Sequence, residues 1–233
     1  MIWWVKLSRP DLSIVFPAYN EEKNIVACMD AALPFVQTHN AEILVIDDGS
    51  QDQTASLVQS YPHVRLIQHN ENRGYGAALR TGFAHSKGKW VFFTDSDLQF
   101  RLDDLHEFWK YTSDYDVIIG YRYPRRDPRY RILYAKVWAR IVNHVMKISI
   151  RDVNCAFKLI KNDALSVLVL QADGAAINAE MLKKLSSKRI IQLPVHHYPR
   201  RQGMQSGGNV TVIIRALWEL LLLQKADIEV QKP

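Results

Sequence analysis

Residues 90–99 read Trp90-Val91-Phe92-Phe93-Thr94-Asp95-Ser96-Asp97-Leu98-Gln99, and this stretch constrains the fold more than any other. It begins with a continuously apolar run, which is typical of a short strand buried on both faces of a parallel sheet. Two aspartates follow directly, separated by one residue. In open α/β sheets, ligands bind at the carboxyl ends of the strands. The acidic pair is therefore expected at a ligand-binding edge.

The same alternation of short apolar runs and amphipathic segments continues along the chain. We expect strands at Leu12–Phe16, Ile43–Ile46, Val64–Ile67, Trp90–Thr94, Val117–Ile119, Phe157–Ile160 and Ile190–Val195. We expect helices at Glu21–Val36, Asp52–Ser60, Tyr75–His85, Leu105–Tyr111, Ile132–Lys147, Ala175–Leu185 and Val210–Gln224. Strands that alternate with helices predict an α/β fold, with a mostly parallel central sheet covered by helices on both faces.

The composition is that of an ordinary globular protein. The chain has 233 residues, 48% of them hydrophobic, and we expect one domain over 1–233. Its two cysteines, Cys28 and Cys155, lie in apolar contexts and are expected to be buried and reduced. No secretory signal or stretch of ~20 apolar residues is visible. These features predict a cytoplasmic protein, with peripheral contact to the cytoplasmic face of a membrane left open.

The acidic pair is the strongest chemical signal. Asp95 and Asp97 can both reach one divalent cation, directly or through water, and Mg²⁺ and Mn²⁺ prefer such oxygen ligands. They commonly join protein carboxylates to substrate phosphates. The alternative interpretation is a strand-to-helix turn with a capping aspartate.

Three further motifs follow other predicted strands. Pro17-Ala18-Tyr19-Asn20-Glu21 offers a flat surface and an acceptor for a nucleobase, and Asp47-Asp48-Gly49-Ser50 offers another acceptor. In Asn72-Arg73-Gly74-Tyr75-Gly76 the glycines allow backbone to approach a phosphate or a sugar closely. Helix capping, a glycine turn and helix-to-sheet packing are the simpler explanations for these motifs taken one at a time.

Together, the four motifs resemble glycosyltransferase family 2 of the GT-A fold, and most closely its dolichyl-phosphate mannose synthase and polyprenyl-phosphate glycosyltransferase branch. The resemblance extends through Gly120-Tyr121-Arg122, Arg151-Asp152, Phe157-Lys158-Leu159 and Arg200-Arg201-Gln202-Gly203. It implies an inverting, metal-dependent transferase that moves a sugar from a GDP- or UDP-sugar to a lipid-linked phosphate. It also implies a nucleotide-sugar half at 12–120 and an acceptor half at 121–233 that ends in an amphipathic helix.

The resemblance assigns roles to particular residues. Asp95 and Asp97 would hold Mg²⁺ or Mn²⁺ and the diphosphate, while Asp152, Asp97 and Arg122 would act at the reacting centre. The residues that would hold the nucleotide-sugar are Pro17, Ala18, Tyr19, Glu21, Ile46, Asp48, Asp95, Ser96, Gln99 and Arg200. Asp152 is a general base if the acceptor is a hydroxyl, and an orienting group if the acceptor is already an anionic phosphate.

Two departures from the family pattern concern the acceptor. Met204-Gln205-Ser206 replaces the Ser-Lys that often follows Arg-x-x-Gly, and Ala156 stands where relatives often carry glycine or an acidic residue. The acceptor therefore remains open between a lipid phosphate and a hydroxyl of a saccharide or another molecule.

The basic balance of the chain, with a formal net charge of +6, favours an anionic partner. Arginines and tyrosines are interleaved over residues 121–131. The helices predicted near 132–146 and 210–223 could insert their apolar faces into a membrane surface, or they could pack on the sheet. A separate membrane partner protein is the other route to a lipid acceptor. A nucleic-acid-binding module and an inactive nucleotide-binding scaffold are the remaining alternatives. Neither accounts for the intact acidic pair, and no nucleic-acid partner is expected.

Overall fold

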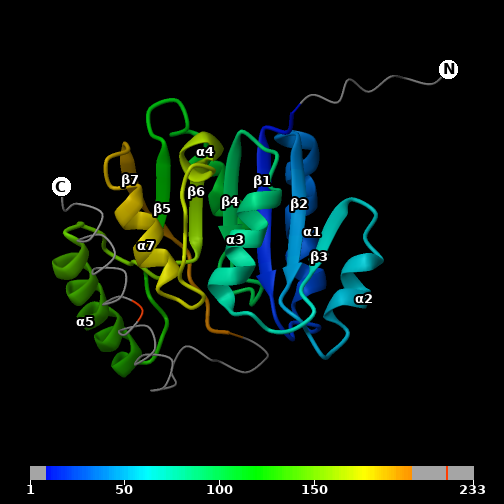
Figure 1. Ribbon diagram of the computed structural model, residues 1–233, viewed down its shortest axis with the longest axis horizontal. Helices are drawn as coiled ribbons and strands as arrows, with labels where there is room; N and C mark the ends of the chain where they lie inside the picture. Colours follow the sequence, from blue (N-terminus) through cyan, green and yellow to red (C-terminus); the bar gives the residue numbers. More distant parts are fainter. Residues whose placement is uncertain (1–8, 201–218, 220–233) are drawn as a thin grey trace.

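The computed structural model describes residues 9–200 and residue 219. Seven strands form one sheet in the order β3-β2-β1-β4-β6-β5-β7 (Figure 1). The strands are β1 (Leu12–Ala18), β2 (Ala41–Asp47), β3 (Val64–Gln68), β4 (Trp90–Thr94), β5 (Val117–Arg122), β6 (Phe157–Lys161) and β7 (Ile190–Val195). All pairings are parallel except those of β6, which is antiparallel to both of its neighbours, β4 and β5.

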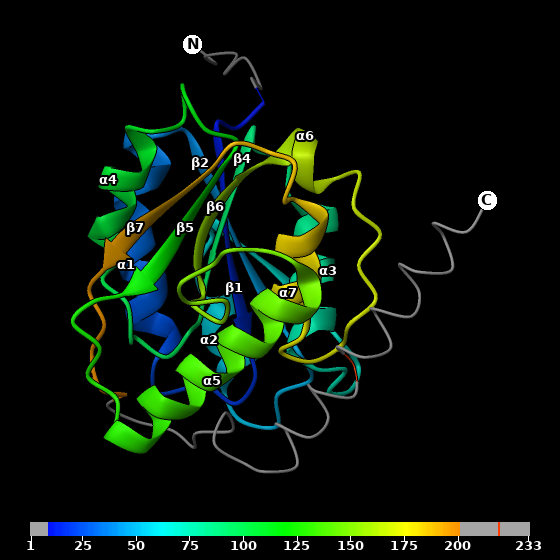
Figure 2. The same ribbon diagram turned by 90° about the vertical axis from the view of Figure 1, so that its left-hand side faces the viewer.

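Helices cover both faces of this sheet (Figure 2). They are α1 (Ile25–Thr38), α2 (Thr54–Gln59), α3 (Tyr75–His85), α4 (Leu105–Trp109), α5 (Arg129–Met146), α6 (Asn162–Leu165) and α7 (Ile177–Lys184), with a 3-10 turn at Leu102–Asp104. The predicted mixed α/β fold with a mostly parallel sheet is confirmed.

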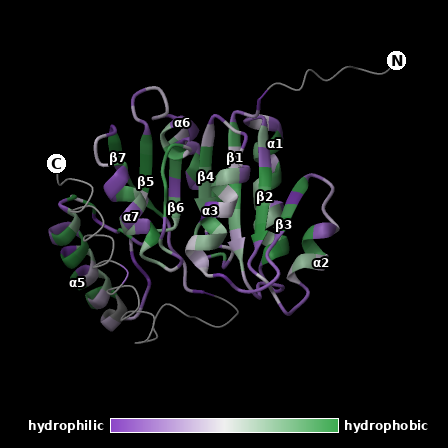
Figure 3. Ribbon diagram, viewed as in Figure 1, coloured by the Kyte–Doolittle hydropathy of each residue, from purple (hydrophilic) through white to green (hydrophobic). Residues whose placement is uncertain are grey.

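Alternate strand residues build two separate cores, because successive side chains of a strand point to opposite faces. Val15 and Phe93 pack on the side that holds α3, α5, α6 and α7. Ile14 and Phe92 pack on the other side, against α1, α2 and α4. Burial on both faces accounts for the continuously apolar runs in the central strands, which are the green ribbons of Figure 3.

The predicted elements lie where the sequence pattern placed them, with shifted ends. The first helix begins at Ile25 rather than Glu21, because residues 21–24 form a turn that hydrogen-bonds the neighbouring loop. β5 continues past Ile119 to Arg122, so this arginine is the last residue of a strand. α6 was not predicted, and the helix predicted at Val210–Gln224 lies, apart from Glu219, outside the described residues.

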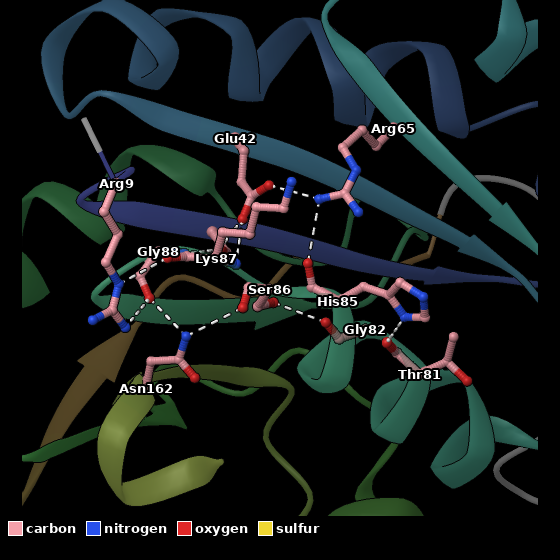
Figure 4. A network of polar contacts seen from close by, with 11 residues as sticks. Arg9, Glu42, Arg65, Thr81, Gly82, His85, Ser86, Lys87, Gly88 and Asn162 are labelled. Carbon is pink, nitrogen blue, oxygen red and sulfur yellow. Dashed lines mark hydrogen bonds and ion pairs between the residues drawn. The ribbon is translucent and has the colours of Figure 1, made fainter. Parts of the chain in front are cut away.

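The amino-terminal edge of the sheet is closed by its own hydrogen bonds (Figure 4). Glu42 accepts from the Ser13 hydroxyl at 2.6 Å and pairs with Arg65 at 2.9 Å. Asn162 donates to the Gly88 carbonyl at 2.7 Å, which joins α6 to the start of β4. Gly88 itself lies so close to β1 that an added Cβ would be 2.5 Å from the Ser13 nitrogen. These polar groups satisfy one another, and the motifs singled out in the sequence lie at the opposite edge.

Candidate active site at the carboxyl edge of the sheet

The loops that follow β1 and β2 form one connected structure. The Asp48 backbone N–H donates to the Ala18 carbonyl at 2.8 Å, the Asn20 N–H to the Ser50 hydroxyl at 2.9 Å and the Glu21 N–H to the Thr54 hydroxyl at 2.9 Å. Gly49, with φ of +76°, lets the loop approach residues 71 and 72, where an added Cβ would be 2.5 Å from the Glu71 carbonyl carbon. Two of the sequence motifs therefore form a single wall.

The Asp48 carboxylate braces the glycine-rich loop from inside this wall. It accepts hydrogen bonds from the Arg73 and Gly74 backbone N–H groups, at 3.0 and 2.8 Å, and lies 2.6 Å from His69 Nδ1. The other ring nitrogen of His69 meets the Thr81 hydroxyl at 2.9 Å. Asp48 is almost fully buried, so it has a structural role in holding the glycine-rich loop. The resemblance implies a second role, in binding the nucleoside. That second role stays a prediction.

The remaining residues predicted to hold the nucleoside differ in what they expose. Tyr19 is 45% exposed just past the end of β1, so solvent reaches the residue. Pro17 is buried, and its carbonyl accepts from the buried Ser96 hydroxyl at 2.7 Å, so Ser96 ties β4 to β1. Ile46 is fully buried against Val15 and Gly82 in the core. Its side chain belongs to the core and offers no surface to a base.

Asp95 and Asp97 lie together at the end of β4; Asp97 is buried, and Asp95 is half-buried with its Oδ1 atom shielded from solvent. Asp97 accepts from the Gln99 backbone N–H at 3.1 Å, and its other oxygen is 3.6 Å from Arg200. Asp95 Oδ1 is buried with no hydrogen-bond partner. Burial, reinforced by the charge of Asp97, raises the pKa of Asp95 to about 7, and burial also raises the pKa of Asp97. A positive charge bound beside the pair would favour the ionised form of both carboxylates.

Asp95 and Asp97 provide ligands that suit a divalent cation. An orphaned buried carboxylate oxygen beside a second carboxylate is the donor set that Mg²⁺ or Mn²⁺ accepts, with substrate phosphates as the other ligands. Across residues 9–200 and 219, no group of three or more His, Cys, Asp or Glu side chains could hold a metal ion. His196 and His197, which are adjacent in the chain, contact different carboxylates: His196 Nδ1 is 2.9 Å from Asp104, and His197 Nδ1 is 3.9 Å from Asp127.

Arg200 joins this acidic pair to the first loop. Its guanidinium donates to Glu21 Oε1, and the same guanidinium is the one near Asp97. Burial raises the pKa of Glu21, although Asn24 and Arg200 both oppose the shift. The Gln99 side chain donates to the Tyr198 carbonyl at 3.2 Å, and the Tyr198 N–H donates to the Gln99 carbonyl at 2.8 Å. Residues 198–200 therefore lie against the predicted metal site.

Arg122 and Asp152 form a second centre at the ends of β5 and the loop before β6. Arg122 Nε donates to Asp152 Oδ2 at 2.7 Å and Nη2 to Oδ1 at 2.8 Å, a two-pronged pair. Arg125 lies 3.8 Å from the same carboxylate. Although burial opposes it, the Arg122 guanidinium holds the pKa of Asp152 below its usual range. Asp152 is consequently a weak proton acceptor at neutral pH.

The structure also reveals a buried lysine near the site that had no assigned role in the sequence reasoning. Lys158 is completely buried on β6, and its ammonium donates to the Val153 and Cys155 carbonyls and to Asn178 Oδ1. It thereby holds the loop that carries Asp152. Desolvation lowers the pKa of Lys158 to about 8. A charged residue inside the apolar run Phe157–Ile160 was the signal available in the sequence.

Comparison with known sequences places this site in context. Residues 13–169 match the sequence model described as glycosyl transferase family 2. A dolichyl-phosphate beta-glucosyltransferase of Trichomonas vaginalis is 29% identical over 180 residues, covering 68% of this chain and 55% of that protein. The Bacillus subtilis protein CsbB, named for glycosyltransferase activity, is 31% identical over 170 residues, covering 70% of this chain and 52% of that protein. The chain thus spans about half the length of these relatives.

Solved structures share the fold. Glucosyl-3-phosphoglycerate synthase from Mycobacterium tuberculosis, solved with phosphoglyceric acid, has a TM-score of 0.72 at 20% identity, covering 91% of this chain and 80% of that one. The same enzyme with Mn²⁺, UDP-glucose and phosphoglyceric acid has a TM-score of 0.73 at 19% identity, covering 92% and 79%. At this level of identity the likeness concerns the fold alone.

Proposed function

Because the chain belongs to glycosyl transferase family 2, we propose that it transfers a sugar from a GDP- or UDP-sugar to a polyprenyl phosphate, with inversion at the anomeric carbon. The chain is a glycosyltransferase, and the proposal concerns its donor, its acceptor and the residues that serve each. The relative named as a dolichyl-phosphate beta-glucosyltransferase supports this class of acceptor.

The observation that carries the choice of acceptor is the pairing of Arg122 with Asp152. A hydroxyl acceptor needs a base to remove its proton, and Asp152 has both oxygens engaged by Arg122 and a lowered pKa. A phosphate monoester has a second pKa near ~6, so it is largely anionic at neutral pH and needs no base. Arg122 and Arg125 would instead orient that anion.

The group transfer is then a single displacement. An oxygen of the acceptor phosphate forms a bond to the anomeric carbon while the bond from that carbon to the diphosphate oxygen breaks. The leaving nucleoside diphosphate takes the electron pair, and no proton moves. A bound Mg²⁺ or Mn²⁺, held by Asp95 and Asp97, would neutralise charge on the diphosphate. Arg200, beside Asp97 and Glu21, is placed to meet the same phosphates, and Tyr19 to lie against the base.

The acceptor assignment is tested by product analysis. The protein is incubated with UDP-glucose or GDP-mannose and Mn²⁺, and separately offered a short polyprenyl phosphate, 3-phosphoglycerate and an oligosaccharide. We expect a glycosylated polyprenyl phosphate, detected by mass spectrometry. Transfer only to phosphoglycerate or to the oligosaccharide would show a hydroxyl acceptor and would reject the proposed function.

We also propose that α5 brings the enzyme to the surface of the membrane that holds such an acceptor. Leu133, Tyr134, Val137 and Ile141 lie along one side of α5 and are 59, 59, 44 and 36% exposed. The opposite side packs into the core through Ala139, Val142 and Met146. Lys136 and Arg140 are exposed on the same helix and suit anionic lipid. None of the described helices is long and apolar enough to cross a bilayer.

A further inference from the structure

A buried polar layer lies directly beneath the acidic pair. The Tyr75 hydroxyl, at the first residue of α3, is buried and makes no hydrogen bond. It lies beside the Asp95 carboxylate and the Asn178 side chain, close enough that both affect its pKa. Asp95 Oδ1 is the other buried atom there that lacks a partner. An unused donor thus stands next to an unused acceptor, which is rare for buried polar groups in proteins.

The backbone around Tyr75 holds this side chain firmly in place. The Gly76 N–H donates to the Asp173 carbonyl at 2.7 Å, and Arg80 binds the Ala172 carbonyl and the Asp173 carboxylate. An added Cβ on Gly74 or Gly76 would come within 2.5 Å of the carbonyl oxygens of Asp173 or Ala172. The start of α3 therefore fits tightly against the loop before α7, which fixes the backbone on either side of Tyr75.

The rest of the layer is already satisfied. Asn178 Oδ1 accepts from Lys158 at 2.8 Å, and the other two protons of Lys158 go to backbone carbonyls. Lys158 is paired in register with Phe93 of β4, which precedes Asp95 by two residues in the chain. With these groups occupied, the Tyr75 hydroxyl is an unpaired donor available to Asp95, and Thr94, the residue before Asp95, carries a second buried hydroxyl without a partner.

We propose that Tyr75 is a positioning residue, whose hydroxyl donates to Asp95 Oδ1 and fixes the orientation of this carboxylate as it takes up a divalent cation. Carboxylates that bind metals are commonly held by outer hydrogen bonds, and loss of such a partner typically costs about 10–100-fold in metal affinity. The inference rests on the proposed function, because it takes Asp95 as a metal ligand. It adds a residue from α3 to a site otherwise built at the end of β4.

The test is Tyr75→Phe, which removes the hydroxyl and keeps the ring. Mn²⁺ alone is titrated into the full chain, and free Mn²⁺ is followed by electron paramagnetic resonance, so the readout does not depend on catalysis. Thermal unfolding without metal is measured in parallel. Tyr61→Phe is the matched control, because its hydroxyl bonds Asp30 at 2.9 Å in the helices on the other face. Asp95→Asn removes the ligand itself.

We expect Tyr75→Phe to weaken Mn²⁺ binding by roughly 10-fold or more, with Tyr61→Phe unchanged. The metal-free unfolding temperature should stay the same or rise, because a buried unsatisfied hydroxyl is lost. Mn²⁺ affinity within about twofold of wild type overturns the inference while leaving the proposed function intact. Lower metal-free stability with unchanged Mn²⁺ affinity also overturns it, by showing a purely structural role. If the wild type binds Mn²⁺ no better than Asp95→Asn, the metal site of the proposed function fails and this inference with it.

Discussion

Arg122 and Asp152 meet through two parallel hydrogen bonds, from Nε at 2.7 Å and from Nη2 at 2.8 Å, although thirty residues separate them in the chain. The pair joins the last residue of β5 to the loop that precedes β6. Both side chains are largely buried, and no carboxylate oxygen of Asp152 is left without a donor. The carboxylate thus serves first to hold the guanidinium in a set orientation.

The first prediction follows for Asp152→Asn. If Asp152 orients Arg122, the variant should raise the KM for polyprenyl phosphate and lower kcat by less than about 100-fold, the lower part of what a general base contributes. Steady-state kinetics with the acceptor varied measures both. Asp163→Asn, at an exposed carboxylate paired only loosely with Arg9 at 3.7 Å, is the control. A near-complete loss of kcat with donor binding intact would instead show Asp152 acting as a base.

The pH dependence of metal binding provides a second prediction. The raised pKa of Asp95, about 7, means that the folded protein holds a proton that the unfolded chain has released. The cost of burying this charge is therefore fully present above pH about 7 and is relieved as the pH falls. Mn²⁺ requires the ionised form, so its affinity should fall below that pH by up to about tenfold per unit. Calorimetric titrations between pH 5.5 and 8.5 would measure this, and a flat profile would contradict it.

A third prediction concerns Gly49→Ala. The residue has φ of +76°, and a Cβ would meet the Glu71 backbone at 2.5 Å, so neither the backbone angle nor the contact can relax cheaply. We expect a loss of roughly 2–4 kcal/mol in the free energy of unfolding. Denaturant unfolding followed by circular dichroism is the measurement. Gly174→Ala, whose Cβ would meet only the flexible end of Glu219 at 3.0 Å, should lose far less. Equal losses at the two positions would refute the explanation.

The fourth prediction addresses the exposed side of α5. Leu133→Glu combined with Val137→Glu should reduce sedimentation with vesicles of equal parts phosphatidylcholine and phosphatidylglycerol, because it places charge on the apolar side of the helix. Val167→Glu with Val169→Glu is the matched control, since both valines are 73% exposed in the loop that follows α6. Equal loss in both double variants, or no loss in either, would argue against α5 as the membrane contact.

Much of the fold could be predicted because strong local patterns mark it. The runs around Phe16 and Phe93 are buried on both faces, so apolar residues are continuous there, and the motifs that follow them do meet at one edge. Periodicity carries no information on strand direction, and the reversal of β6 was not foreseen. α6, with four residues, is too short for a helical period to show.

The candidate site was predictable in its residue types and less so in its contacts. Asp95 and Asp97 are separated by one residue in the sequence, and this spacing at a predicted strand end suggested a shared cation. The bond from Arg200 to Glu21 joins residues 179 positions apart, and only the tertiary fold brings them together. Asp48 was predicted as an acceptor for a base, whereas its visible partners are the backbone of Arg73 and Gly74 and the ring of His69. Pairings between residues far apart in the chain cannot be predicted from the spacing of residues within a motif.

The reversed direction of β6 has a consequence for how this enzyme could diversify. Residues 123–156 leave the sheet at the end of β5 and return at the start of β6, the strand beside it, so both junctions lie at one edge. A segment that leaves and re-enters the sheet at one edge can be replaced by another without changing the order or direction of the strands that precede it. A graft of this segment from a relative with another acceptor would leave the loops after β1, β2 and β4 in place. Under the proposed function, such a graft would exchange Arg125 and Asp152 while Asp48, Asp95 and Asp97 keep their places in the sheet.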